Sequence, residues 1–130
     1  MRLLDSNTVI HYLQGREPVV RRMQAASPRE LRLPSVVAYE LEYGNLKCGS
    51  DRRKAAMEAI FDSLVQVPFD AAAAREAARI RVELENLGTA IGPLDLMIAA
   101  TALSLGATLV TNNTREFSRI QGLRLEDWTK

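Results

Sequence analysis

Short apolar runs that fit β-strands alternate along this chain with longer stretches of helical periodicity, and this alternation limits the fold more than any other feature. We expect strands at residues 2–4, 31–33, 65–67, 107–111 and 123–125, helices at residues 7–13, 19–26, 36–47, 51–64, 71–86 and 93–105, and a helical turn at 116–120. Prolines and glycines mark most of the junctions. Strands that alternate with helices favour a parallel sheet covered by helices. The expected fold class is therefore α/β, a single-domain α/β/α sandwich with a short, mainly parallel sheet.

Length and composition narrow the possible functions. The 130 residues predict one domain, 1–130, and a net charge of +1 predicts that any nucleic-acid contact is local rather than spread over the surface. The only cysteine, Cys48, cannot form an internal disulfide, which is typical of a reducing cytoplasm. With one cysteine and one histidine, His11, a Cys/His zinc site is excluded, so the ligands of any metal must be oxygens. No run is long and apolar enough for a signal peptide or a membrane span, so we expect a cytoplasmic location.

Three acids stand where a carboxylate is unusual. Asp5 follows the first strand, Glu40 lies within the apolar stripe of the helix at 36–47, and Asp95 lies in the first turn of the helix at 93–105. Each has a structural explanation of its own: Asp5 as a helix N-cap, Glu40 as a boundary residue that reaches solvent, and Asp95 as an acid stabilised by the helix dipole. Taken singly, none of them establishes a site.

The combination of the three acids predicts a metal site. Asp5 and the Asn112-Asn113 corner both follow apolar strands, so both should emerge at the same edge of a parallel sheet, and the helices that carry Glu40 and Asp95 begin after prolines near that edge. Carboxylates placed this close together repel one another and resist ionisation. A divalent cation such as Mg²⁺ or Mn²⁺ removes that cost, and it also activates water and stabilises charge on a phosphodiester under attack.

Four motifs in order support a more specific interpretation. They are Leu3-Leu-Asp-Ser-Asn7, Ser35-Val-Val-Ala-Tyr-Glu-Leu-Glu-Tyr-Gly44, Ile91-Gly-Pro-Leu-Asp-Leu-Met-Ile-Ala-Ala100 and Leu109-Val-Thr-Asn-Asn-Thr-Arg-Glu-Phe117. Together they closely resemble PIN-domain ribonucleases, and more narrowly the VapC toxins of bacterial toxin–antitoxin pairs. Each motif alone is weak, but four at these separations are specific, and the resemblance spans nearly the whole chain.

The resemblance implies a Mg²⁺-dependent endoribonuclease, with Mn²⁺ as a substitute, and assigns its residues. Asp5, Glu40 and Asp95 match the three acidic positions of the family; Asp5 and Asp95 would hold the main metal. The position that is often a fourth acid is Asn113 here, which leaves Glu116 as the nearest carboxylate. Supporting polar roles fall to Ser6, Asn7, Thr111 and Asn113.

The resemblance also implies partners. The substrate would be RNA, with a transfer RNA, and in particular the initiator tRNA cut in its anticodon loop, as the leading candidate. A VapB-like antitoxin would bind the protein in a groove near the active site, and DNA would be contacted only through that antitoxin. A homodimer is expected, and no membrane contact.

Two other classes remain open on the sequence. The chain could be a catalytically inactive binding module, or a phosphoacceptor α/β domain with Asp5 as nucleophile, although haloacid-dehalogenase-type phosphatases need a second aspartate where this chain has Asn7. The basic run Arg52-Arg53-Lys54 fits either a solvated helix face or a contact with an RNA backbone. Glu126 and Asp127 are interpreted as surface acids, and Phe117 and Trp128 as core residues.

Overall fold

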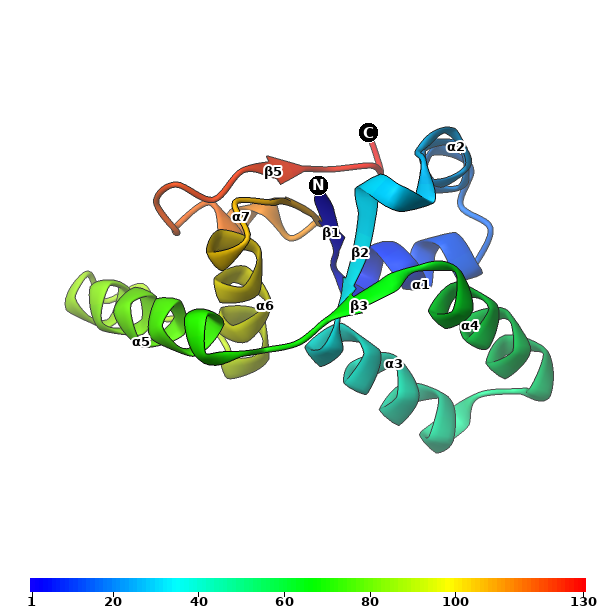
Figure 1. The fold of residues 1–130 in the computed structure, drawn as a ribbon, viewed down its shortest axis with the longest axis horizontal. Helices are drawn as coiled ribbons and strands as arrows, with labels where there is room; N and C mark the ends of the chain where they lie inside the picture. Colours follow the sequence, from blue (N-terminus) through cyan, green and yellow to red (C-terminus); the bar gives the residue numbers. More distant parts are fainter.

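Five short parallel strands form one sheet in the order β3-β2-β1-β4-β5. The computed structural model describes residues 1–130. The strands are β1 (Arg2–Leu4), β2 (Leu31–Pro34), β3 (Val65–Val67), β4 (Thr108–Val110) and β5 (Leu125–Glu126). The first strand of the chain is therefore the central one, with β2 on one side and β4 on the other (Figure 1). Because β1 and β4 are parallel neighbours, the residues that directly follow them lie close together at the carboxyl edge of the sheet.

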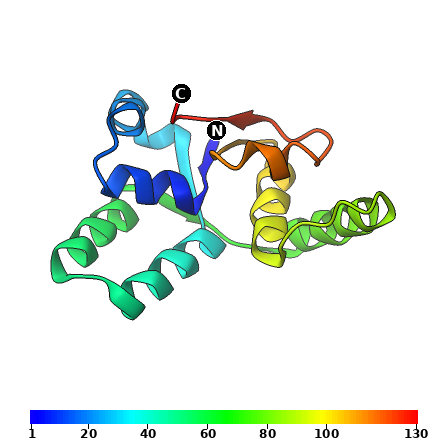
Figure 2. The ribbon, with the colours of Figure 1, turned by 180° about the vertical axis from the view of Figure 1, so that it is seen from behind.

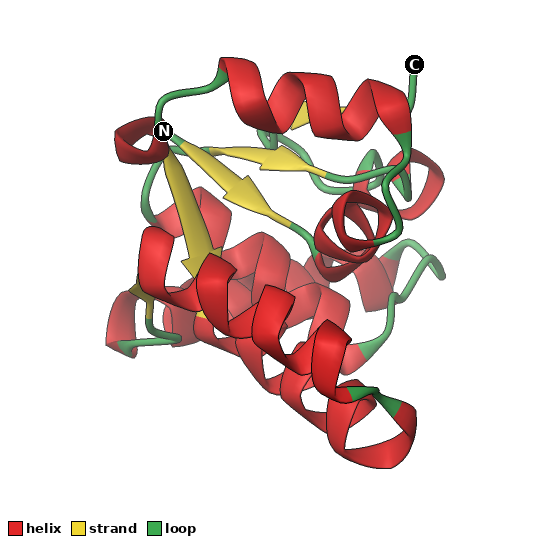
Figure 3. Ribbon diagram, turned by 90° about the vertical axis from the view of Figure 1, so that its right-hand side faces the viewer, coloured by secondary structure: helices red, strands yellow, loops and turns green.

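Helices cover the sheet in two groups. They are α1 (Ser6–Leu13), α2 (Glu17–Ala25), α3 (Ser35–Cys48), α4 (Asp51–Ser63), α5 (Ala71–Asn86), α6 (Pro93–Ser104) and α7 (Thr114–Phe117), with a 3₁₀ turn at Pro28–Glu30. Figures 1 and 2 show α1 to α4 on one side of the central strands and α5 to α7 on the other. Seen from the side, the strands splay with the twist of the sheet between helices (Figure 3). The expected α/β/α sandwich is confirmed, and none of its helices is both long and apolar enough to cross a membrane.

The hydrophobic core includes the central strands β1 and β4. Leu3, Leu4, Leu109 and Val110 have no exposed surface, so β1 and β4 are apolar on both faces, as parallel strands between two helical layers must be. Phe117 is also fully buried and Trp128 is 3% exposed, which confirms both as core residues. The polar residues that directly follow these strands are therefore attached to a well-packed, fixed backbone.

Several local predictions were wrong. Two helices begin one residue earlier than predicted: α1 begins at Ser6, because Asp5 is its N-cap and the Asp5 carboxylate accepts from the Ser6 amide, and α3 begins at Ser35, directly after Pro34. The last helix begins at Thr114 and not at residue 116. The last strand is Leu125–Glu126 and not 123–125, because its pairing with β4 joins Leu125 to Leu109 and Glu126 to Val110. Short elements are placed by such tertiary pairing more than by local preference.

Candidate active site

Asp5 is the best fixed residue of the candidate site. It follows β1 directly and is only 3% exposed. Its Oδ2 accepts a hydrogen bond of 2.6 Å from the Thr111 hydroxyl, and its Oδ1 accepts one of 2.8 Å from the Ser6 amide. Thr111 comes directly after β4, the neighbour of β1. The prediction that the ends of these two strands meet is therefore confirmed.

Two further contacts hold this corner of the site. The hydroxyl of Thr111 also accepts from the amide of Asn113 at 3.0 Å, so the turn after β4 is tied to the same oxygen that orients Asp5. The hydroxyl of Thr8, which is buried, donates to the carbonyl oxygen of Val110 at 3.0 Å and anchors α1 to β4. Sequence reasoning missed Thr8. The signal was a hydroxyl three residues after Asp5, on the side of the helix that also carries buried apolar residues.

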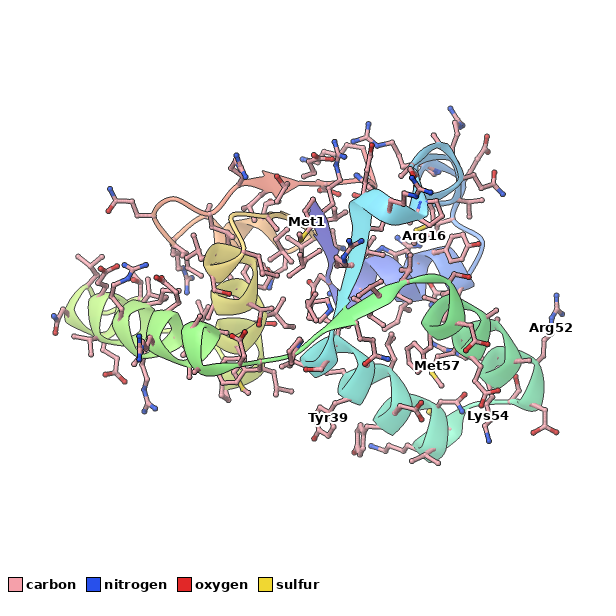
Figure 4. The ribbon with its side chains drawn as sticks, in the orientation of Figure 1. Met1, Arg16, Tyr39, Arg52, Lys54 and Met57 are labelled. Carbon is pink, nitrogen blue, oxygen red and sulfur yellow. The ribbon has the colours of Figure 1, made fainter.

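Glu40 lies on α3 with its side chain half-buried. Val36, Val37 and Leu41 on the same helix are buried, so the carboxylate does interrupt an apolar stripe. Its Oε1 is enclosed and has no hydrogen-bond partner. Burial is the main reason why the pKa of Glu40 is raised, and the charges of Asp5 and Asp95 raise it further, while a hydrogen bond from Ser6 partly offsets these effects. The preceding residue, Tyr39, points outward from α3 (Figure 4).

Asp95 enters the site from the opposite group of helices. It lies in the first turn of α6, which begins at Pro93, and the residues on its face, Ile98, Ala99 and Ala102, have no exposed surface. Burial raises the pKa of Asp95 to about 6, with further contributions from the charge of Asp5 and from the charge and carboxyl contact of Glu116. An acid that served only the helix dipole would be stabilised in its ionised form, so Asp95 is not explained by that role.

Glu116 and Asn113 form a pair at the remaining side of the site. The Asn113 amide nitrogen donates to Glu116 Oε2 at 3.3 Å, and Glu116, like Asp5, raises the pKa of Asp95. Asn113 therefore orients a carboxylate in this arrangement, and Glu116 brings the charge. Asn7 is exposed on α1 and lines a hollow that it shares with Ser6 and Glu40.

Burial and the charges of nearby acids raise the pKa values of Glu40 and Asp95, yet the acids do not surround one common point. Asp5, with its own pKa raised by burial against the lowering effect of Thr111 and Ser6, acts on both Glu40 and Asp95. No group of three or more histidine, cysteine, aspartate or glutamate side chains forms a complete metal-binding arrangement. A cation held by two carboxylates and water would need no such group, and Mg²⁺ is commonly bound in that way. The unpartnered Oε1 of Glu40 and the mutual repulsion of the acids fit a divalent cation.

One acid lies elsewhere and does not behave as predicted. Glu126 was interpreted as a surface acid, but it is half-buried on β5 and accepts hydrogen bonds from Arg2 at 2.9 Å and from the indole of Trp128 at 3.1 Å. Arg22 lies 3.4 Å from it. Asp127 is also only partly exposed. These residues join the last strand to the rest of the sheet and take no part in the candidate site.

The fold and the site together define a parallel α/β domain with a group of carboxylates at the carboxyl edge of its central strands. The chain belongs to the PIN-domain family, whose model matches residues 2–123.

Similar proteins agree with this assignment. The chain is 41% identical over 128 residues to a tRNA(fMet)-specific endonuclease VapC of Shigella flexneri, which covers 98% of this chain and 97% of that protein. It is 38% identical over 127 residues to the protein of the same name from Salmonella typhimurium, covering 97% and 96%. Among solved structures, DNA-bound VapBC from Salmonella typhimurium has a chain that superposes with a TM-score of 0.91 at 38% identity, covering 98% and 97%. The expected resemblance to VapC proteins is confirmed.

Proposed function

We propose that this protein is a Mg²⁺- or Mn²⁺-dependent endoribonuclease that cleaves a transfer RNA and acts as the toxin of a two-protein toxin–antitoxin pair. The observation that supports the proposal is the environment of Glu40 and Asp95: burial raises the pKa of both carboxyls, and the charges of Asp5 and of other nearby acids raise them further. The names of the relatives give the reaction class, and the initiator tRNA is the substrate that two of them are named for.

Asp5 and Asp95 are the residues that would hold the cation. Asp5 is oriented by Thr111 and Ser6 on one side of the site, and Asp95 faces it from α6. When bound, the ion supplies positive charge that stabilises the pentacovalent phosphate and makes a nearby water more acidic. Oxygen ligands and a small number of carboxylates are the donors that Mg²⁺ and Mn²⁺ prefer.

Glu40 is suited to accept the proton of the attacking water. Its Oε1 has no partner within the protein, and its raised pKa brings the carboxylate closer to the range in which a general base works at neutral pH. Glu116, oriented by Asn113, keeps a further negative charge beside Asp95 and can bind a water in the site. No side chain needs to become covalently attached to the substrate.

A phosphoacceptor function is disfavoured by the residue two positions after Asp5. Haloacid-dehalogenase-type phosphatases need a second aspartate there, and this chain has Asn7, which is exposed on α1. Asp5 therefore lacks the acid that would accompany it in such an enzyme.

The partners follow from the relatives. The Salmonella typhimurium structure is a VapBC complex bound to DNA, and we infer that this chain likewise pairs with a VapB-type antitoxin that carries the DNA contact. We further infer a homodimer in the cytoplasm, where its RNA substrate is found. Sedimentation of the purified protein, alone and with the antitoxin, measures both associations.

The proposal is tested with purified protein and initiator tRNA. We expect cleavage with Mg²⁺ or Mn²⁺, none with EDTA, and loss of at least 100-fold in rate, an order-of-magnitude figure, in Asp5→Asn and Asp95→Asn. Asp62→Asn, a change of the same chemistry on the exposed face of α4, should cut at the wild-type rate. A folded Asp5→Asn or Asp95→Asn variant with full activity would refute the site. A wild-type protein that binds the antitoxin but cuts no RNA would identify a binding module.

A further inference from the structure

A groove leads from the candidate active site to the beginning of α4. Its inner part is a hollow of about 290 Å³ between α1, α3 and α4, with Ser6, Asn7 and Glu40 among its lining residues. Its outer part is a hollow of about 200 Å³ lined by Gln14, Ser50 and Arg52 among others. Leu13 and Arg53 line both parts, so the two hollows adjoin at these side chains. A ligand that lies along this path has one end at Glu40 and the other at the beginning of α4.

The two ends of the groove differ in charge. The inner end has the carboxylate of Glu40, and the outer end has Arg52 and Arg53, neither of which forms an ion pair within the protein. By contrast, Arg79 and Arg81 on α5 are both bound to glutamates of their own helix. The exposed Asp51 is the one acid in the first turn of α4.

Arg53 is better placed than its neighbours on the same helix. Figure 4 shows Arg52 extended away from the body of the protein and Lys54 directed away from the sheet, whereas Met57, one turn after Arg53, lies between α3 and α4. Met57 is 2% exposed and lines the inner hollow with Arg53. The amide of Arg53 donates to the Ser50 hydroxyl at 3.1 Å, which fixes the start of the helix. Its guanidinium is thus carried on a fixed turn beside the groove.

We propose that this groove holds the RNA backbone next to the cleaved bond and that Arg53 is a positioning residue that binds one of its phosphates. The inference rests on the endoribonuclease activity proposed above. A guanidinium without an internal partner binds a phosphate through paired N–H groups, and a strand held there at one phosphate has fewer ways to lie beside Glu40. The mixed lining of the groove, with Ile10 and Leu41 beside polar groups, accommodates both the sugar and the charged backbone.

The test compares cleavage of initiator tRNA by wild type, Arg53→Ala, Arg53→Lys and Arg75→Ala at several salt concentrations. Arg75 is the matched control, because it is an exposed arginine without an ion pair on α5, in the other group of helices. For Arg53→Ala we expect KM to rise about 3- to 10-fold while kcat changes less than about twofold, and the slope of log(1/KM) against log[salt] to become shallower by about 0.7. Arg53→Lys keeps the charge but not the paired N–H groups, so it should restore the salt slope and recover only part of the loss in KM, and Arg75→Ala should match wild type.

A second measurement separates binding from catalysis. Fluorescence anisotropy of labelled initiator tRNA with Asp5→Asn and with Asp5→Asn/Arg53→Ala should show weaker binding in the double variant, and equal melting temperatures would exclude unfolding. The proposal is overturned if wild type is active and Arg53→Ala has an unchanged KM and salt slope. It is also overturned if Arg53→Ala weakens only the antitoxin complex, since the groove would then hold a peptide. The wild-type protein is assayed first. If it does not cut RNA, the proposed endoribonuclease function is refuted, and this outcome is distinct from a failure of the Arg53 proposal.

Discussion

At the scale of single residues, one hydroxyl links several parts of the candidate site. Thr111 donates to Asp5 at 2.6 Å and accepts from the Asn113 amide, so it joins the ends of β1 and β4 to the turn that carries Glu116. Thr101 has the same chemistry in a different place: it is 1% exposed and its hydroxyl bonds to the Met97 carbonyl of its own helix. The two threonines therefore separate the effect of orienting Asp5 from the effect of losing a buried hydroxyl.

We expect Thr111→Val to reduce cleavage roughly 10- to 100-fold at fixed Mg²⁺, because residues that orient a ligand typically contribute that much to metal affinity or activity. Part of the loss should be recovered at higher Mg²⁺, which is measured by titrating the metal in the cleavage assay. Thr101→Val should keep the wild-type Mg²⁺ dependence. Equal Mg²⁺ curves for both variants would show that the contact with Asp5 is structural only.

The burial of Asp95, together with repulsion from Asp5 and Glu116, predicts that this carboxylate lowers the stability of the folded protein. The pKa of this carboxyl is raised from 3.8 to about 6 in the folded protein, so at pH 7.5 the ionised form is less favourable in the folded than in the unfolded state. In EDTA at pH 7.5, we expect Asp95→Asn to melt a few degrees above wild type. The difference should shrink as the pH falls through about 6, since Asp95 then becomes protonated in the folded state. A variant that melts below wild type in EDTA would contradict this account, and Asp62→Asn serves as the control.

At the scale of elements, periodicity and turn residues predicted the middle of the chain better than its C-terminal end. The strand at 65–67 and the helix at 71–86 were both predicted correctly, because each depends on local chemistry. The strand is a short apolar run, and the helix has helical spacing and begins after Asp70, whose side chain accepts from the Ala73 amide. The position of β5 was not predicted correctly, because its register is decided by pairing with β4 across the sheet. For the same reason Glu126 was misinterpreted, since its partners Arg2 and Arg22 are more than 100 residues away.

The hydrogen bonds and ion pairs of Glu126 predict that the folded protein loses stability at low pH. Burial alone would raise the pKa of Glu126, but hydrogen bonds from Trp128 and Arg2 and the charges of Arg2 and Arg22 together lower it below its ordinary 4.5. A lowered pKa in the folded state adds stability above about pH 4.5, and that stability is lost as the pH falls through the folded value. We expect Glu126→Gln to lose about 1 kcal/mol at pH 7 and to approach wild type near pH 3, measured by urea unfolding.

The control for this experiment is Glu58→Gln. Glu58 is exposed on α4 and forms no ion pair, so its replacement should change stability little at either pH. If the free energies of unfolding of Glu126→Gln and wild type differ by the same amount from pH 7 to pH 3, the contribution of Glu126 comes from packing and not from its charge.

At the scale of the whole molecule, the topology brings together acids that are far apart in the chain. Asp5 follows the central strand, Glu40 comes from the helix after β2, and Asp95 and Glu116 come from the other group of helices. The four motifs identified these acids as candidates for one site. They could not predict how Asn113 and Glu116 divide their roles, because that depends on the geometry of one turn after β4.

The grouping of these acids leads to a prediction about the folded protein as a unit. A cation that binds the native site and not the unfolded chain stabilises the fold by RT ln(1 + [L]/Kd), about 2.7 kcal/mol when the free ion is 100-fold above Kd. We expect millimolar Mg²⁺ to raise the melting temperature by several degrees and Mn²⁺ to raise it more, since Mn²⁺ binds oxygen and nitrogen sites more tightly than ions of the alkaline-earth series. NaCl at the same ionic strength should have a smaller effect, because it only screens the repulsion. The double variant Asp5→Asn/Asp95→Asn should melt at the same temperature with Mg²⁺ and with EDTA. If wild type behaves like this variant, the acids are a repulsive cluster without a cation site, and a role for metal in cleavage has no support in the fold.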